Sequence, residues 1–253
     1  MTSADRGLNR RSLLAAGGGV LGAAALAMAG AKAGAQQVST RSEGPSPDFG
    51  GRIRVAFVMG PGATMIDFAG PWEVFQDTQP GDQPAFYLYT VADSTDELRT
   101  SGNYVDGKPM GLRFRPDYSF ADAPQPKIIM MGAQRDHTPA KIDWIRQAAA
   151  KADYVGSTCT GAFLLAKTGL LDGLSATTHH DFFDSFEKDF PKVKLVRDAR
   201  FVDNGKFITA GGLTSGIDGA LHIVDRMHGR QMADHVVKYM EYGGAGWRTR
   251  ERA

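Results

Sequence analysis

Short apolar segments without polar interruption alternate with amphipathic segments along most of this chain, and this alternation limits the possible folds more than any other feature. Such an apolar run indicates a strand buried on both faces, as in a parallel sheet with helices on each side. The expected strands cover residues 53–59, 84–92, 127–131 and 153–158. The expected helices cover about ten residues from Pro71 and the segments 139–151, 160–168, 178–190, 215–228 and 231–242.

This pattern predicts the α/β class, with a single domain and a mostly parallel sheet flanked by helices. Asp203-Asn204-Gly205 lies between the short apolar segments 199–202 and 206–209. An Asn-Gly pair in this position is typical of a β-hairpin turn, so a small hairpin is also expected. In open α/β sheets ligands bind beyond the carboxyl ends of strands, which is where functional residues are sought.

The N-terminus has the composition of an export signal. Arg10 and Arg11 precede a weakly apolar stretch rich in Ala and Gly, and small residues precede Gln36, as at a cleavage site. The alternative is a retained anchor, but a membrane span needs about 20 strongly apolar residues, so no stable membrane anchor is expected. Residues 1–35 are therefore predicted to be a twin-arginine signal peptide that directs the protein to the periplasm.

The rest of the chain divides into three parts by composition. Residues 36–52 are rich in Ser, Gly and Pro and predict a flexible leader. Residues 53–242 carry the strand and helix pattern and form the expected domain, and residues 243–253 are expected to be a polar tail. The formal net charge of +1 does not favour a nucleic-acid partner, and the tail is too short for a helix-turn-helix.

Cys159 is the only cysteine in the chain and follows directly on an expected strand. A lone cysteine in an exported protein is either a buried apolar residue or a reactive thiol. Here Gly161 allows a tight turn into the next helix, whose free N–H groups then face the thiol. Such amides stabilise a thiolate and can lower a cysteine pKa from about 8.5 toward about 4–7. This placement favours a functional thiol.

Several motifs carry a resemblance to a known family. They are Cys-Thr-Gly-Ala-Phe-Leu-Leu-Ala at 159–166, Gly-Leu-Leu-Asp-Gly at 169–173, Ala-Thr-Thr-His at 176–179, Ile-Asp-Phe-Ala-Gly-Pro-Trp-Glu-Val-Phe at 66–75 and Thr-Ala-Gly-Gly-Leu-Thr-Ser-Gly-Ile-Asp at 209–218. Together they resemble the ThiJ/PfpI superfamily, in particular its isonitrile hydratase branch and the related sensor domains of AraC-type regulators. The resemblance implies a flavodoxin-like, class I glutamine amidotransferase-like fold, and it implies a homodimer.

The resemblance also implies roles for individual residues. Cys159 matches the nucleophile, and Asp67 matches the acidic residue whose side chain contacts the thiol. Thr160 occupies the position where protease-like relatives carry His, which disfavours a peptidase. From the residues alone, Asp67 could instead cap the helix near Pro71, and Thr160 could be an ordinary first-turn residue.

Three further residues are implied for a substrate or oxyanion pocket. Gly132 and Ala133 replace the Gly-Gly turn whose amides help to bind an anion in hydratase-like relatives, and His179 matches a histidine near the cysteine. A structural histidine is the alternative. No ligand spacing typical of a metal site accompanies the histidines, so neither a metal nor another cofactor is expected.

The expected function is that of a cysteine-dependent hydratase that adds water to small isonitriles and releases N-substituted formamides through a thioimidate on Cys159. Two alternatives stay open. One is a glyoxalase- or deglycase-type cysteine enzyme, and the other is a non-catalytic periplasmic ligand or redox sensor of the same fold. In each case the partner is a small molecule.

Overall fold

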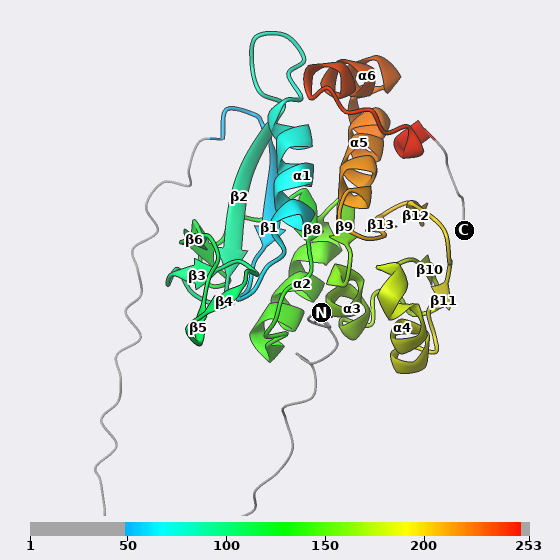
Figure 1. The fold of residues 1–253 in the computed structure, drawn as a ribbon. Helices are drawn as coiled ribbons and strands as arrows, with labels where there is room; N and C mark the ends of the chain where they lie inside the picture. Colours follow the sequence, from blue (N-terminus) through cyan, green and yellow to red (C-terminus); the bar gives the residue numbers. More distant parts are fainter. Residues whose placement is uncertain (1–48, 249–253) are drawn as a thin grey trace, which may run out of the picture. The chain divides into compact units, whose positions relative to one another are not determined.

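The computed structural model describes residues 49–248, so the predicted signal at 1–35 and most of the predicted leader lie outside this range. Seven strands form one sheet in the order β12-β13-β9-β8-β1-β2-β7 (Figure 1). All neighbours in this sheet are parallel except β12 and β13, which are antiparallel. The strands are β1 Ile53–Val58, β2 Phe86–Ala92, β7 Tyr118–Ser119, β8 Ile128–Met131, β9 Tyr154–Thr158, β12 Phe201–Asp203 and β13 Phe207–Ala210.

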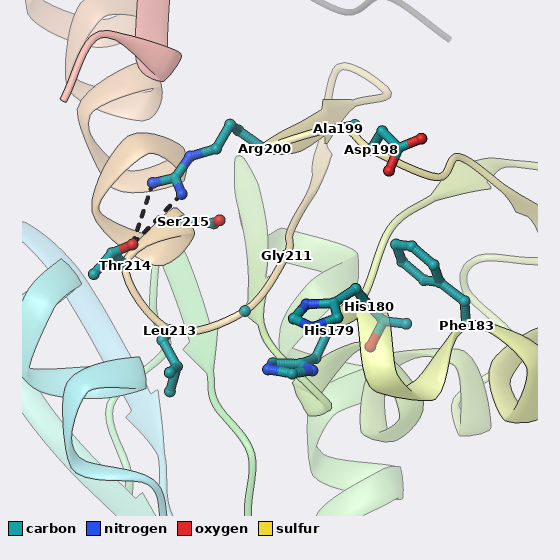
Figure 2. A pocket seen from close by; sticks show the side chains of 12 residues that line it. His179, His180, Phe183, Asp198, Ala199, Arg200, Gly211, Leu213, Thr214 and Ser215 are labelled. Carbon is teal, nitrogen blue, oxygen red and sulfur yellow. Dashed lines mark hydrogen bonds between the residues drawn. The ribbon is translucent and has the colours of Figure 1, made fainter.

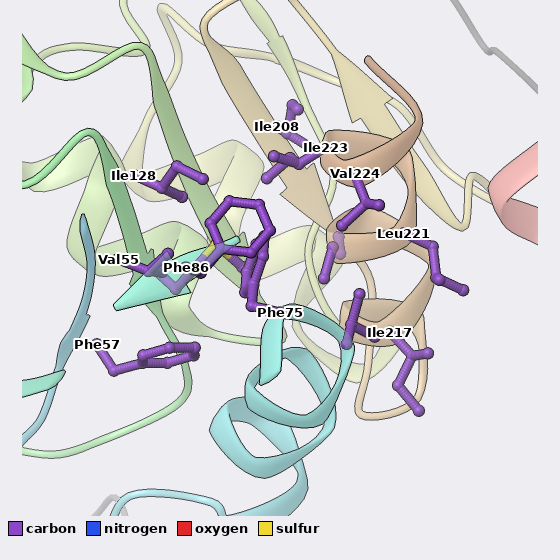
Figure 3. Close-up of a cluster of buried hydrophobic side chains, with 14 of the residues drawn as sticks. Val55, Phe57, Phe75, Phe86, Ile128, Ile208, Ile217, Leu221, Ile223 and Val224 are labelled. Carbon is purple, nitrogen blue, oxygen red and sulfur yellow. The ribbon is translucent and has the colours of Figure 1, made fainter. Parts of the chain in front are cut away.

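Helices cover both faces of this sheet. The helices are α1 Met65–Gln76, α5 Ser215–His228 and α6 Arg230–Tyr239 on one face, and α2 Pro139–Lys151, α3 Gly161–Lys167 and α4 Phe183–Asp189 on the other. Alternate residues of β1 belong to different apolar clusters. Val55 and Phe57 pack with α1 and α5 (Figure 3), whereas Ala56 and Val58 pack with α2 and α3. The predicted α/β class with a mostly parallel sheet is therefore confirmed.

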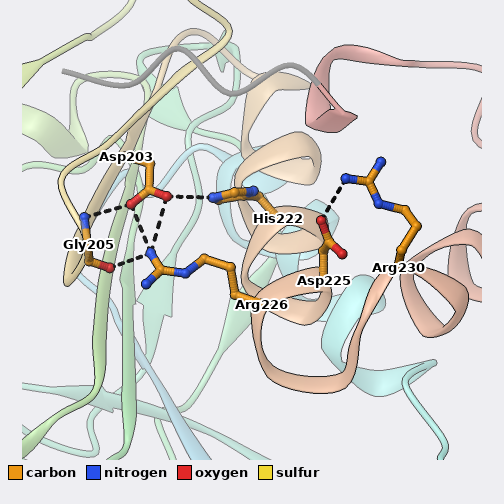
Figure 4. A network of polar contacts seen from close by, with 6 residues as sticks. All are labelled: Asp203, Gly205, His222, Asp225, Arg226 and Arg230. Carbon is orange, nitrogen blue, oxygen red and sulfur yellow. Dashed lines mark hydrogen bonds and ion pairs between the residues drawn. The ribbon is translucent and has the colours of Figure 1, made fainter.

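The predicted hairpin is also present, and a polar network ties it to helix α5 (Figure 4). Asp203 accepts hydrogen bonds from the Gly205 amide at 2.7 Å and from Arg226 Nη1 at 2.9 Å. Its other oxygen lies 2.7 Å from Nε2 of the buried His222. Because Arg226 is charged and His222 is buried, and both lie on α5, these contacts hold the β12–β13 hairpin at the edge of the sheet against this helix.

Three two-stranded ribbons lie outside the main sheet. Two of them lie within residues 98–114, between β2 and β7. The ribbons pair β3 Leu98–Arg99 with β6 Arg113–Phe114, β4 Tyr104–Val105 with β5 Lys108–Pro109, and β10 Ser175–Ala176 with β11 Lys194–Leu195.

Helix α1 begins earlier than its sequence predicts. It starts at Met65, so Pro71 lies inside the helix rather than at its first position. A proline has no N–H to donate to the carbonyl four residues before it, which leaves the Asp67 carbonyl without its helical partner. The earlier start places Asp67 in the first turn, and the N-cap position belongs to Thr64. Asp67 therefore does not cap this helix.

The described domain extends beyond the predicted limits at both ends. Phe49, assigned to the flexible leader, packs its ring 4.8 Å from the ring of Tyr87 on β2. Trp247, assigned to the polar tail, is fully buried in a 3-10 helix, Gly246–Arg248, and belongs to the apolar cluster of α5 and α6. A single tryptophan among glycines and arginines has no period to read, so only the packing identifies it as part of the core.

Within residues 49–248 no helix is both long enough and apolar enough to cross a membrane.

Candidate functional site

Cys159 lies in a strained turn between β9 and α3. Its φ of 58° is in the left-handed region, which residues other than glycine adopt mostly where the surroundings impose it. Its N–H donates to the Gly211 carbonyl at 2.8 Å, and its carbonyl accepts from the Thr178 hydroxyl at 2.9 Å. A Cβ on Gly161 would lie 2.4 Å from the Met131 carbonyl oxygen. This glycine therefore allows α3 to approach β8, and the turn takes the predicted place.

Asp67 reaches the thiol of Cys159 from the first turn of α1, and the two side chains interact directly. The carboxyl group is almost completely buried, with 2% of the residue exposed. Its Oδ2 accepts a hydrogen bond from the Ala133 amide at 2.9 Å, while Oδ1 has no nitrogen or oxygen partner in the described part of the chain. Burial raises the pKa of Asp67 to about 6, although the Ala133 amide and the thiol oppose that rise.

The thiol is protonated at neutral pH in this environment. Burial is the main cause that raises the pKa of Cys159 to about 12, and the carboxylate of Asp67 adds to it. The amides of Thr160 and Leu213 bond to the sulfur and lower the pKa, but by less. The lowered pKa predicted from the sequence is therefore wrong for this state. Of the amides expected at the start of the next helix, that of Thr160 is present, but with only 6% of Cys159 exposed desolvation outweighs the effect of both amides.

The amides around the sulfur differ from those expected. Leu213, to which the 209–218 motif assigned no role, has a φ of 53°, and its N–H bonds to the sulfur. The Ala133 amide is bound by Asp67 instead of being free for an anion. A Cβ on Gly132 would lie 2.6 Å from the Asp67 Cβ. Gly132 and Ala133 therefore position the carboxyl group, while Thr160 and Leu213 surround the sulfur.

The Gly-Gly pair before Leu213 was the sequence signal that could have identified this loop, because it permits a close backbone approach. Thr160 contributes its backbone N–H, and its side chain does not cap α3.

His179 packs against the loop that carries Leu213 rather than acting as a residue of the predicted 178–190 helix. A Cβ on Gly212 would lie 2.4 Å from Cδ2 of His179, so ring and backbone are in close contact. The ring also stacks on His180, with centroids 4.4 Å apart, and its Nδ1 accepts from the Asp181 amide. Regular helix begins only at His180, as a short 3-10 turn before α4. The reason is that Thr178 bonds to Cys159 and does not cap a helix.

A pocket of about 480 Å³ lies between the segment that begins at Thr178 and the 211–215 loop (Figure 2). Thr178 and Gly211, which bond to Cys159, line the pocket, and so does Leu213, whose amide faces the sulfur. The rest of the wall comes from the segments 179–183, 198–200 and 212–215. Cys159 and Asp67 are not among the lining residues, so a small molecule in this pocket would lie next to the residues that hold the thiol rather than on the sulfur itself.

One group of side chains among the described residues has a spacing that could hold a metal ion. It consists of His179, His180 and Asp181, whose ligand atoms lie within 4.8 Å of one another. His180 and Asp181 are exposed, and the Nδ1 of His179 already accepts a hydrogen bond. Three consecutive residues on such a turn do not require an ion, so we assign no metal here.

Comparisons with known proteins agree with this fold. The sequence profile of the DJ-1/PfpI family matches residues 53–226. An isonitrile hydratase from Pseudomonas putida is 30% identical over 201 residues, which are 76% of this chain and 80% of that enzyme. The HTH-type transcriptional regulator GbdR from Pseudomonas aeruginosa is 29% identical over 177 residues, but these cover only 48% of the regulator and 62% of this chain.

Among solved structures, a ThiJ/PfpI family protein from Pseudomonas syringae superposes with a TM-score of 0.65 at 25% identity and covers 77% of each chain.

Proposed function

Since the chain belongs to the DJ-1/PfpI family, we propose that it is a cysteine-dependent hydratase that adds water to small isonitriles and forms N-substituted formamides. The contact between the buried Asp67 carboxyl and the Cys159 thiol carries this proposal. The 30% identity to an isonitrile hydratase supports the same substrate class. The pair holds one proton between two groups, and isonitrile hydration needs such a proton.

In the first step the sulfur of Cys159 bonds to the terminal carbon of the isonitrile. The thiol proton passes to Asp67, which is ionised above its pKa of about 6, and from there to the same carbon. The product is a thioimidate in which carbon has gained one sulfur and one hydrogen. A protonated thiol suits this step, because the carbon needs both the sulfur and the proton.

In the second step a water molecule adds its oxygen to the thioimidate carbon. One water proton reaches the nitrogen through Asp67, and the carbon–sulfur bond of the resulting adduct then breaks. The hydroxyl proton returns to the sulfur as the formamide leaves. The Thr160 and Leu213 amides stabilise the negative charge that develops on sulfur during this cleavage.

A binding role without turnover is the second candidate, because curated relatives include HTH-type transcriptional regulators. The raised thiol pKa disfavours a redox sensor, since sensor cysteines have thiolate character. No feature of the site favours a glyoxalase over a hydratase. Export of the protein to the periplasm is proposed from its N-terminal sequence, and assembly into a homodimer is proposed from the family resemblance alone.

The test is turnover of cyclohexyl isocyanide by the purified protein, measured as formamide release. Replacing the nucleophile in Cys159→Ser is expected to reduce kcat/KM by at least about 1,000-fold. If the wild-type protein releases no formamide but consumes methylglyoxal, the glyoxalase alternative replaces the proposal. If it acts on neither compound, the binding role replaces it.

A further inference from the structure

One side of the pocket is rich in hydrogen-bond donors that the proposed chemistry does not use. Arg200 from the segment before β12 lies there, together with Thr214 and Ser215 at the start of α5 (Figure 2). The positive end of the α5 dipole faces the same side. These groups come from the two ends of the β12–β13 hairpin and converge on one wall.

Asp218 holds the guanidinium group of Arg200 in place. This carboxylate is fully buried and accepts from Arg200 Nε at 2.7 Å and also from Nη2. It also accepts from the hydroxyl of Tyr242 at 3.2 Å and from the amide of Trp247 at 3.0 Å. The side chain of Arg200 is therefore oriented before any ligand binds, which reduces the entropy that binding costs.

The Nη1 group of Arg200 retains capacity to donate. Its contact with the Thr214 hydroxyl is 3.5 Å, which is the limit of a hydrogen bond. The Thr214 hydroxyl and Arg200 Nη1 lie together in Figure 2, and both line the pocket. An acceptor with two oxygens could take a hydrogen bond from each of them.

Acidic groups near this wall do not prevent an anion from binding. Asp218 is engaged with Arg200 and lies below the surface. Asp198 also lines the pocket, but in Figure 2 its carboxylate points away from the guanidinium group.

We infer that the pocket recognises a carboxylate, so that the preferred isonitriles carry a carboxylate on the carbon chain opposite the reacting group. Arg200 and Thr214 would each donate to this carboxylate while the isonitrile carbon lies at Cys159. The inference rests on the proposed function for its reaction, but the recognition itself is a property of the pocket. Hydrogen bonds to a charged group are the stronger kind and give direction as well as affinity.

The experiment compares isocyanoacetate, 3-isocyanopropanoate and 4-isocyanobutanoate, each beside its neutral methyl ester. For the best-fitting chain length, kcat/KM for the carboxylate is expected to exceed that for the ester by about 10-fold or more. Arg200→Lys keeps the charge but removes Nη1, and Thr214→Val removes the hydroxyl. Each is expected to reduce this ratio several-fold, whereas the matched control Arg113→Lys on β6 is expected to keep it.

A ratio near or below one in the wild-type protein overturns the inference, and so does a ratio that both pocket variants leave unchanged. If the wild-type protein hydrates none of these isonitriles, the proposed function is wrong, while recognition of a carboxylate by the pocket is still to be tested. Carboxylate recognition by the pocket is then tested by calorimetry. The affinities of N-formylglycine, N-formyl-β-alanine and N-formyl-γ-aminobutyrate are each compared with that of the corresponding primary amide. Preference for the carboxylates that is lost in Arg200→Lys supports the inference, and equal or absent binding overturns it.

Discussion

Asp67 and Cys159 are ionisable side chains that the fold removes almost completely from water. Burial raises both pKa values, and the carboxyl group is the one that titrates near neutrality, at about 6. The two groups therefore act as a carboxylate beside a thiol, with the proton on sulfur. This arrangement lowers the free energy of unfolding, because an ionised carboxyl group is unfavourable in a site that excludes water.

The activity of the site should depend on the ionisation of Asp67. Because the carboxylate accepts the thiol proton, kcat/KM is expected to rise with pH through about 6 and to stay level to about pH 9. Asp67→Asn should lower kcat/KM by about 100-fold to 10,000-fold and remove the rise. The exposed Glu73→Gln on the same helix serves as the control. A rise of the same midpoint in Asp67→Asn would assign the titration to another group.

The stability of the fold should fall over the pH range in which the activity rises. A carboxyl group with a raised folded-state pKa destabilises the fold when it is ionised, so this cost is complete above about pH 6 and absent below about pH 4. Asp67→Asn is therefore expected to raise the Tm at pH 8 and not at pH 4. The free energy of unfolding at pH 8 should rise by at most about 3 kcal/mol. Thermal unfolding at both pH values measures it, and an equal change at both would contradict the ionisation argument.

At the scale of elements, the site is built where the β9–α3 turn meets the 211–214 loop. His179 packs on Gly212, and the next residue, Leu213, directs its amide to the sulfur. The histidine that the family resemblance implied therefore lies near the site but acts through the backbone of this loop. Neither a motif nor a period predicts that contact, since it depends on the approach of two loops far apart in the sequence.

Gly212→Ala tests this contact. The added Cβ would meet the His179 ring and displace the Leu213 amide, so kcat/KM is expected to fall by about 10-fold to 100-fold. Combining it with His179→Ala removes the obstruction and should restore part of the loss, which a double-mutant cycle would show as coupling. Gly219→Ala is the matched control, because its Cβ would have an ordinary 3.5 Å contact with Ala210. Additive losses in the cycle would argue against positioning by His179.

At the scale of the whole described domain, the C-terminal segment completes the core and supports the pocket. Trp247 fills the space beside α5 and α6, and Arg230 and Arg248 lie over its ring at 4.6 Å and 4.9 Å. Its amide bonds to Asp218, which also orients Arg200. Residues assigned to a polar tail by their composition therefore reach the pocket wall through one buried carboxylate.

Trp247→Ala is expected to lower the free energy of unfolding by about 3–5 kcal/mol, because it leaves a large cavity in the core. Equilibrium denaturation in urea measures this loss. Tyr239→Ala, which removes an exposed aromatic side chain from α6, should change it by less than about 0.5 kcal/mol. Similar losses in the two variants would show that the C-terminal segment does not belong to the core.

The parallel sheet, the hairpin and the place of Cys159 at a strand end could all be predicted from the sequence, because apolar periodicity and turn residues are local signals. Its motifs also singled out Asp67 and His179. The tertiary structure decided the rest: the start of α1 before Pro71, the amides around the sulfur, the role of Trp247 and the direction of the thiol pKa. These properties depend on burial and on contacts between distant segments. Local sequence patterns predict neither the desolvation of a side chain nor the contact between two loops.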